Sequence, residues 1–260
     1  MDGFDNLNGT IIKSASITVA EVTKEELRAI NKFALTPLTD TEVFSFRLIV
    51  CDNEVDRDFE CFSLKALQQL KKLLVGKTLI KDHSPRADNQ VARIYDTELL
   101  QDGTKTTKTG ELYSQLIAKA YMVKTADNES LITEIKAGIK KEASISCSVK
   151  SAICSICGTD NRKGYCNHFR GREYDNGGKK NVCTFTLDNV IDAYEVSLVA
   201  IPAQRNAGAC KSYGDTVFNE SDVIQNSTKT KSIKEDSTAD CKIKLFESFI
   251  FTQKQKEITE

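Results

Sequence analysis

The first elements that the hydrophobic pattern predicts are a short helix and a strand. Thr23 and Glu26 have the spacing of a capping box, which begins a helix, and Pro37 stops the pattern. The apolar residues between these signals share one helical face: Leu27, Ile30 and Phe33. The segment 43–51, VFSFRLIVC, is rich in β-branched and aromatic residues, which predicts the first core strand. The acidic stretch that follows, through Asp58, is predicted to be a turn.

Two more helices and another strand follow. Ser63 is a suitable N-cap, Gly76 a suitable terminator, and the apolar residues between them share a face: Leu64, Leu67, Leu70 and Leu74. The segment 110–123, which includes LYSQLIAKAYMV, alternates loosely and predicts a strand. A further helix is predicted to begin near Asp127 or Asn128, with apolar residues at helical spacing: Leu131, Ile132, Ile135 and Ile139.

The hydrophobic period changes from helical to two directly after that helix. One face of the predicted strand carries Ala143, Ile145, Cys147 and Val149, and the other carries Ser144, Ser146 and Ser148. Apolar strand character returns in VIDAYEVSLVAIPA, which Pro202 ends. The predicted elements therefore include both strands and helices.

Changes in composition predict the domain organisation. Residues 1–42 form an N-terminal arm with a short helix, and residues 43–210 form the core domain. Residues 151–184 interrupt that core with an insert rich in cysteine, glycine and lysine. Residues 211–260 form a polar tail that is predicted to be largely disordered.

Charge and cysteine content restrict the functional classes. The chain balances 36 basic against 37 acidic residues, so no overall basic field favours binding to nucleic acid or to an anionic membrane. No apolar run reaches the roughly 18 residues that span a bilayer, and the start lacks a secretory signal. The sequence therefore predicts a cytoplasmic protein. Nine cysteines without an export signal favour metal ligation or free thiols over a disulfide framework.

The insert contains four residues with the types and spacing of a structural zinc site. Cys154 and Cys157 form a CxxC pair, and Cys166 and His168 follow after a short loop. Four such ligands complete a tetrahedral site, which leaves no open position for catalysis. Cys183 could replace one ligand. Free or buried thiols are one alternative, and a redox CxxC is another, although the expected βαβ context is absent.

Histidine-dependent chemistry would depend on His83. The chain has two histidines, and His168 is assigned to the zinc site. A loop histidine is more often a solvated residue unless a nucleophile lies within hydrogen-bond reach. Likewise, the row of serines that begins at Ser144 is more often a solvated strand face than a catalytic one.

Three segments in order resemble the prohead protease family of tailed bacteriophages. These are KDHSP at 81–85, IKAGIKKEASISCSV at 135–149 and AYEVSLVAIPAQRNA at 193–207. In that family a histidine follows a short strand, the nucleophilic serine lies six residues after a glycine, as Ser144 does after Gly138, and an EVSLV-like strand leads into Pro-Ala. The resemblance covers about residues 43–210. It implies an α+β fold similar to the herpesvirus assemblins, with a compact β-barrel-like core of mixed and antiparallel strands flanked by helices.

The resemblance also implies a role for each site residue. His83 is the general base, Ser144 the nucleophile and Glu195 the third member that orients the imidazole, with Asp192 in reserve. Many family members have glycine where this chain has Ser146, which could shift the nucleophile to that residue. A plain ion pair between Glu195 and a residue such as Arg93 is the structural alternative.

The implied function is a serine endopeptidase that matures the phage prohead. Its partners would be the major capsid protein and the scaffold protein of the same phage, together with further copies of itself, inside the prohead in the bacterial cytoplasm. It could also cleave its own tail. Two other classes stay open: a non-catalytic assembly protein that keeps the fold, and a zinc-stabilised adaptor that binds nucleic acid through Arg162, Lys163, Arg170 and Arg172.

Overall fold

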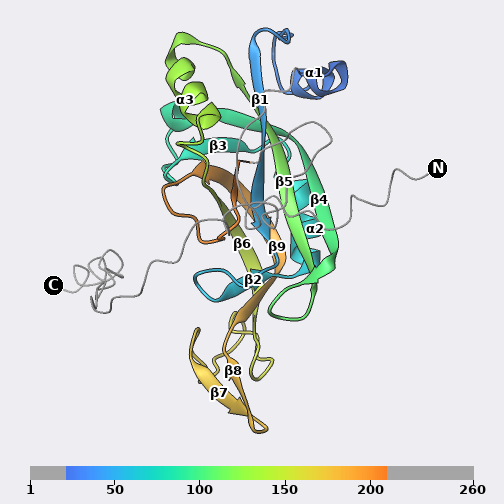
Figure 1. Cartoon of the computed structure of the whole chain (residues 1–260), viewed down its shortest axis with the longest axis vertical. Helices are drawn as coiled ribbons and strands as arrows, with labels where there is room; N and C mark the ends of the chain where they lie inside the picture. Colours follow the sequence, from blue (N-terminus) through green and yellow to red (C-terminus); the bar gives the residue numbers. More distant parts are fainter. Residues whose placement is uncertain (1–21, 210–260) are drawn as a thin grey trace, which may run out of the picture. The chain divides into compact units, whose positions relative to one another are not determined.

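A computed structural model describes residues 22–209 of the chain (Figure 1). The predictions for the first 21 residues and for the polar tail 211–260 lie outside these described residues. The described part is α+β, as predicted, with one mixed sheet of eight strands, a separate pair of strands, three α-helices and a single turn of 3-10 helix at Ala87–Asn89. No helix within residues 22–209 is long and apolar enough to cross a membrane.

The large sheet is organised around one long strand, β9. Along one edge β9 pairs antiparallel with β6, and along the other it pairs in parallel with β2 at its start and with β3 at its end (Figure 1). The rest of the sheet continues from β3 in the order β4, β5, β1 and β10. The strands of this sheet are β1 (Val43–Asp52), β2 (Glu60–Phe62), β3 (Thr78–Lys81), β4 (Ala92–Thr106), β5 (Leu112–Val123), β6 (Ala143–Cys154), β9 (Phe185–Leu198) and β10 (Gly208–Ala209).

The sheet does not close into a barrel, which corrects the predicted β-barrel-like core. Strand β10 has only two residues, so it pairs with β1 over two positions and cannot extend a ladder to β6. Between β10 and β6 there is one isolated bridge, from Gly208 to Glu142, and the Ala143 N–H donates to the Ala207 carbonyl over 3.4 Å. Apart from these contacts at the start of β6, no ladder of hydrogen bonds among the described residues joins β6 to β1, and the sheet stays open between them.

The helices begin at the predicted side-chain caps, with one shift. Thr23 caps α1 (Lys24–Asn31) in a complete capping box with Glu26, and Ser63 caps α2 (Leu64–Leu73). Helix α3 (Ala126–Lys136) begins one or two residues before the prediction, because the Thr125 hydroxyl accepts from the third N–H of the helix. It also ends before Ile139, which is 70 % exposed and not part of the apolar face that was predicted.

The main core fills the space between α2, α3 and the sheet. The buried helix residues come from the predicted apolar faces, and they pack on residues from all the long strands. Representative fully buried side chains are Leu67, Leu70, Leu74, Ile94, Leu116, Ile135 and Val196. A second, smaller core lies under α1 and includes Ile30 and Tyr95.

A buried carboxylate holds the end of the described chain against β1 and β5. Asp52 Oδ2 accepts from the Tyr113 hydroxyl over 2.9 Å and from Asn206 Nδ2 over 3.0 Å. The Asp52 N–H donates to Gln204 Oε1 over 2.8 Å. Because Asp52 is 3 % exposed, burial raises the pKa of its carboxyl. This network explains why the segment after Pro202 lies beside β1.

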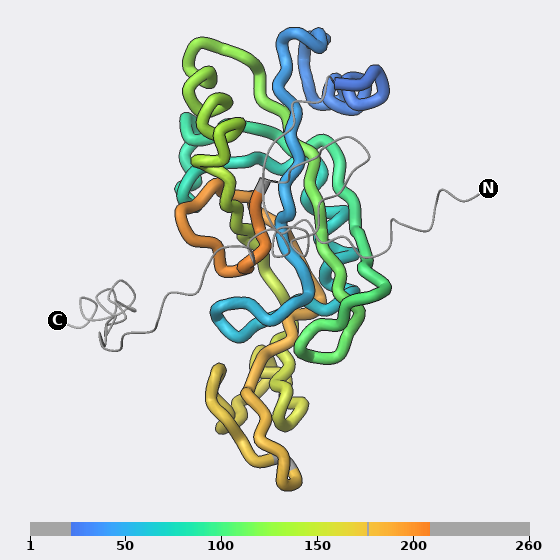
Figure 2. Tube along the Cα trace, in the orientation of Figure 1, coloured from blue at the N-terminus to red at the C-terminus, as the bar shows by residue number. Residues whose placement is uncertain are grey.

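The cysteine-rich insert connects the ends of β6 and β9. The Cα trace leaves the sheet at Cys154 and returns at Phe185 (Figure 2). Residues 151–154, which the sequence placed in the insert, belong to β6, so the connection starts about four residues later than predicted. It contains the hairpin of β7 (Glu173–Asn176) and β8 (Lys179–Val182), and Cys183 lies in a small core with Ala152, Cys154 and Phe185.

Substituting Gly208 with alanine tests the contact between β10 and the start of β6. A Cβ atom there would lie 2.5 Å from the Lys141 carbonyl oxygen, a backbone atom that cannot rotate away. We expect Gly208→Ala to lower the free energy of unfolding by about 1–3 kcal/mol in urea denaturation. Gly103→Ala is the matched control, because nothing lies within 4 Å of its added Cβ, and it should be neutral. Equal effects of the two variants would contradict the assignment.

Candidate functional site

His83 lies in a turn whose backbone is fixed to β9. The chain leaves β3 at Lys81, and both Asp82 and His83 have left-handed backbones, with φ of 54° and 50°. Such a conformation costs roughly 1–2 kcal/mol for each non-glycine residue, so surrounding contacts must compensate. The Asp82 N–H donates to the Leu198 carbonyl over 3.0 Å, and the His83 N–H donates to Ser197 Oγ over 2.9 Å. Strand β9 thus determines where the imidazole lies.

The structure brings His83 and Glu195 together. His83 Nδ1 lies 2.7 Å from Glu195 Oε1. Because an ionised carboxylate only accepts hydrogen bonds, Nδ1 carries the proton in this pair, and Nε2 is left as the basic nitrogen. The Ser197 hydroxyl donates to the other carboxylate oxygen over 2.8 Å. Glu195 is 7 % exposed and the His83 side chain 41 % exposed, so a buried anion supports an accessible imidazole.

The alternative partners considered for this pair are engaged elsewhere. Arg93 Nη1 donates to the Gly76 carbonyl over 2.7 Å, so Arg93 is not the partner of Glu195. Asp192, the reserve third member, pairs with Lys77 Nζ at 3.1 Å. Sequence reasoning missed Ser197, although its position two residues after Glu195 puts both side chains on the same strand face.

Both candidate nucleophiles lie on β6 beside this pair. In the antiparallel register Ser146 is opposite Glu195, and Ser144 is opposite Ser197. Paired residues in antiparallel strands project to the same side, so the two serines share a face with Glu195. A pocket is lined by Ser146, His83 and Glu195 together with Ile80, Pro85, Ile145 and Tyr194. Ser144 lines the adjoining pocket, which also includes Ser146.

Neither of the two candidate serine hydroxyls is hydrogen-bonded to the imidazole of His83. Within residues 22–209, neither Ser144 nor Ser146 forms a hydrogen bond with His83. Catalytic hydrogen bonds are often long or misaligned in the absence of substrate, so this spacing does not remove either serine. The arrangement brings an imidazole, a carboxylate and two hydroxyls to one open surface.

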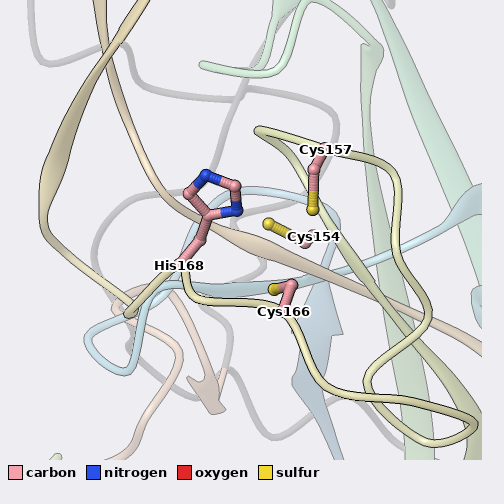
Figure 3. Close-up of side chains that lie close together, drawn as sticks. All are labelled: Cys154, Cys157, Cys166 and His168. Atoms are coloured by element: carbon pink, nitrogen blue, oxygen red, sulfur yellow. The ribbon is translucent and has the colours of Figure 1, made fainter.

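The four predicted metal ligands also converge, at the far end of β6. Cys154 is the last residue of that strand, and the Gly158 N–H donates to the Cys154 carbonyl over 2.9 Å, which closes the turn that contains Cys157. Figure 3 shows the three thiols and the imidazole around one space. Their ligand atoms all lie within 4.8 Å of one another, compared with about 3.8 Å between sulfurs in a tetrahedral zinc site with Zn–S of about 2.3 Å.

The histidine of this Cys3His cluster (Cys154, Cys157, Cys166 and His168) fits a metal ligand. Its Nδ1 is buried and has no hydrogen-bond partner among the described residues, which is costly unless another group satisfies it. The ring packs edge-on against Tyr174, with centroids 4.6 Å apart, so its orientation is fixed. The cluster could therefore hold a metal ion such as zinc.

The group of ligand atoms that converges does not include Cys183, and the thiols of Cys157 and Cys183 also differ in pKa. Hydrogen bonds from the side chain and backbone of Thr159 lower the pKa of the Cys157 thiol to about 6. Burial raises the pKa of Cys183 to about 12, although its Sγ lies 3.8 Å from Cys154 Sγ. Because metals bind the thiolate, Cys157 is the better ligand of the two.

Comparisons with protein-family models, with curated proteins and with solved structures found no match to this chain. The interpretation of the two sites therefore depends on their geometry and on the short segments that resemble prohead proteases.

Metal analysis of cysteine variants tests the Cys3His cluster. We expect the purified full chain to retain about one zinc ion after dialysis, as a closed four-ligand site does. Cys157→Ser should retain almost none, because the hydroxyl is a much weaker ligand than the thiolate. Cys183→Ser is the control and should keep its zinc. A Cys183→Ser variant that loses zinc as completely as Cys157→Ser would place Cys183 in the ligand set together with Cys157.

Proposed function

We propose that this chain is a serine endopeptidase of the prohead-maturation type. The observation that carries the proposal is the 2.7 Å contact between His83 and Glu195 beside two serines on the neighbouring strand. The residues in this contact come from segments of the chain that are 112 positions apart, and they are those that the resemblance pairs. An ordinary surface histidine is hydrogen-bonded to water, so a buried carboxylate at Nδ1 distinguishes His83 from such a residue.

The chemistry would follow the usual logic of a serine nucleophile. A serine hydroxyl is too weak an acid to attack an amide unaided, so Nε2 of His83 takes its proton as the hydroxyl attacks the scissile carbonyl. Glu195 stabilises the imidazolium that forms. His83 then donates that proton to the leaving amine, and the same residues activate water for hydrolysis of the acyl-enzyme. The Cys3His cluster takes no part in these steps.

Two considerations favour different nucleophiles. The resemblance assigns the role to Ser144, six residues after Gly138. The geometry favours Ser146, because it lies opposite Glu195 and lines the same pocket as His83. Both hydroxyls are on the same strand face as Glu195, so the strand pairing alone does not choose between them.

The substrates and setting of the proposed activity come from the resemblance alone. They are segments of the scaffold protein and of the major capsid protein, cleaved by a homo-oligomeric enzyme inside the assembling prohead in the host bacterial cytoplasm. Self-cleavage within residues 211–260 belongs to the same proposal. The alternative is an assembly protein without catalysis, which the missing contact between His83 and either serine favours.

Co-expression with the capsid and scaffold proteins of the same phage tests the activity and identifies the nucleophile. We expect the wild type to cleave these proteins, and either Ser144→Ala or Ser146→Ala to reduce cleavage by about 10³-fold or more. Ser148→Ala is the matched control, since Ser148 is on the same strand but opposite Asp192. If the wild type leaves both partner proteins intact, or if cleavage survives both substitutions, the endopeptidase proposal fails.

The third member can be identified by two conservative substitutions. Glu195→Gln keeps the size of the side chain but removes the anion that stabilises the imidazolium, so we expect kcat to fall by about 10²–10⁴-fold. Asp192→Asn should leave kcat unchanged, because Asp192 pairs with Lys77 and not with His83. Rates are measured on purified scaffold protein by gel densitometry, with thermal unfolding as the check on folding. The reverse order of effects would assign the role to Asp192.

A further inference from the structure

A second pocket adjoins the serines and has an acidic wall. Its lining includes Ser144 and Ser146 together with three carboxylates: Asp56 and Asp58 of the segment that connects β1 to β2, and Glu60 at the start of β2. The remaining lining is mostly apolar and comes from β1, β2, β6, β9 and residues 203–204, which follow β9. We call this the acidic pocket. The sequence predicted only a turn for the segment that provides its carboxylates.

The negative charge of the acidic pocket is only partly neutralised. Glu60 pairs with Arg170 at 2.8 Å, whereas no cationic side chain in residues 22–209 forms an ion pair with Asp56 or Asp58. Asp56 Oδ1 accepts the N–H groups of Asp58 and Glu60, which fixes the carboxylate in place. Partial burial raises the pKa of Asp56 and of Glu60, as expected of carboxylates that lack a sufficient counter-charge.

A buried amide in the same pocket also lacks a partner. Gln204 is 6 % exposed, and its Oε1 accepts the Asp52 N–H, which leaves Nε2 as the free end. That Nε2 has no hydrogen-bond partner in the described part of the chain. A buried donor without a partner costs about 1–3 kcal/mol, which a carbonyl oxygen of a bound peptide would offset.

The edge of β6 along this pocket is open. On the side away from β9, backbone hydrogen bonds to other described segments are made at Ala143 and again from Ala152 onward, and none is made between these positions. An open strand edge can pair with an extended peptide, which is a common mode of peptide recognition. The serines lie within this open stretch.

We propose that the acidic pocket binds a lysine or arginine side chain of an extended substrate peptide, next to the bond that the serine cleaves. The peptide pairs with the open edge of β6, its basic side chain meets Asp56 and Asp58, and Gln204 Nε2 donates to one of its carbonyl oxygens. This inference rests on the proposed endopeptidase function and names the specificity of the same site.

Cleavage of a peptide library tests the specificity. The probe is a set of internally quenched peptides in which one position at a time is lysine, arginine, glutamate or alanine, incubated with the purified full chain. We expect lysine or arginine at one position to raise kcat/KM about tenfold over alanine, and glutamate to lower it. Asp58→Asn should reduce that preference about threefold or more. Asp58 is exposed, so this change does not threaten the fold.

A control variant and a second pocket variant show whether the effect comes from the acidic pocket. Glu98→Gln removes one exposed carboxylate from β4, which does not line the pocket, and should change no rate. Asp56→Asn keeps the oxygen that accepts two backbone N–H groups, so it should act in the same direction as Asp58→Asn. Equal cleavage of lysine and alanine peptides by the wild type would overturn the inference while the endopeptidase proposal stands.

A binding experiment separates the two proposals further. The Ser144→Ala/Ser146→Ala double variant is titrated with a labelled peptide that carries a single lysine, and with its alanine counterpart. We expect about tenfold tighter binding of the lysine peptide, reduced when Asp58→Asn is added. Binding without this preference overturns the inference whether or not the wild type cleaves any peptide. Binding with the preference, combined with no cleavage by the wild type, would refute only the catalytic proposal.

Discussion

The antiparallel pairing of β6 with β9 is the constraint on which both candidate sites depend. This ladder runs from the pair Ala143–Leu198 to the pair Cys154–Phe185. Its register places the serines opposite Glu195 and Ser197, while its far end starts the Cys3His cluster. A slip of one residue would turn the serines toward the core and the apolar residues outward. Because burial of one face opposes such a slip, the hydrophobic pattern itself fixes the position of the hydroxyl groups.

The local elements could be predicted because their signals are local. The side chains of Thr23 and Ser63 cap helices where the sequence indicates, and the period-two pattern of β6 is confirmed by its pairing. Strand β4 had no such signal, because much of it after Thr97 is exposed and polar and is held by its ladder with β5. Strand β2 has three residues, which is too few for any period. The open sheet could not be foreseen, since it follows from the brevity of β10.

The candidate sites could be predicted in composition but only partly in arrangement. A carboxylate inside an apolar strand is costly without a partner, and that argument leads to Glu195 and its histidine. Ser197 on the same strand could also have been predicted, since its hydroxyl accepts the His83 N–H and donates to Glu195. Ligand spacing alone identified the cysteines. The acidic pocket could not be found in this way, because it forms only where the segment before β2 folds back toward β6.

The β6–β9 ladder is irregular between the serines and the Cys3His cluster. Its register shifts between Ser146 and Cys147 and again between Ser148 and Val149. Bulges interrupt a ladder and raise its local twist, so regular pairing does not run unbroken from the cysteines to the serines. Fraying that starts at Cys154 would meet these breaks before it reached the hydroxyl groups. The two ends of β6 are therefore held by separate stretches of regular pairing, one from Ala143 to Ser146 and the other from Val149 to Cys154.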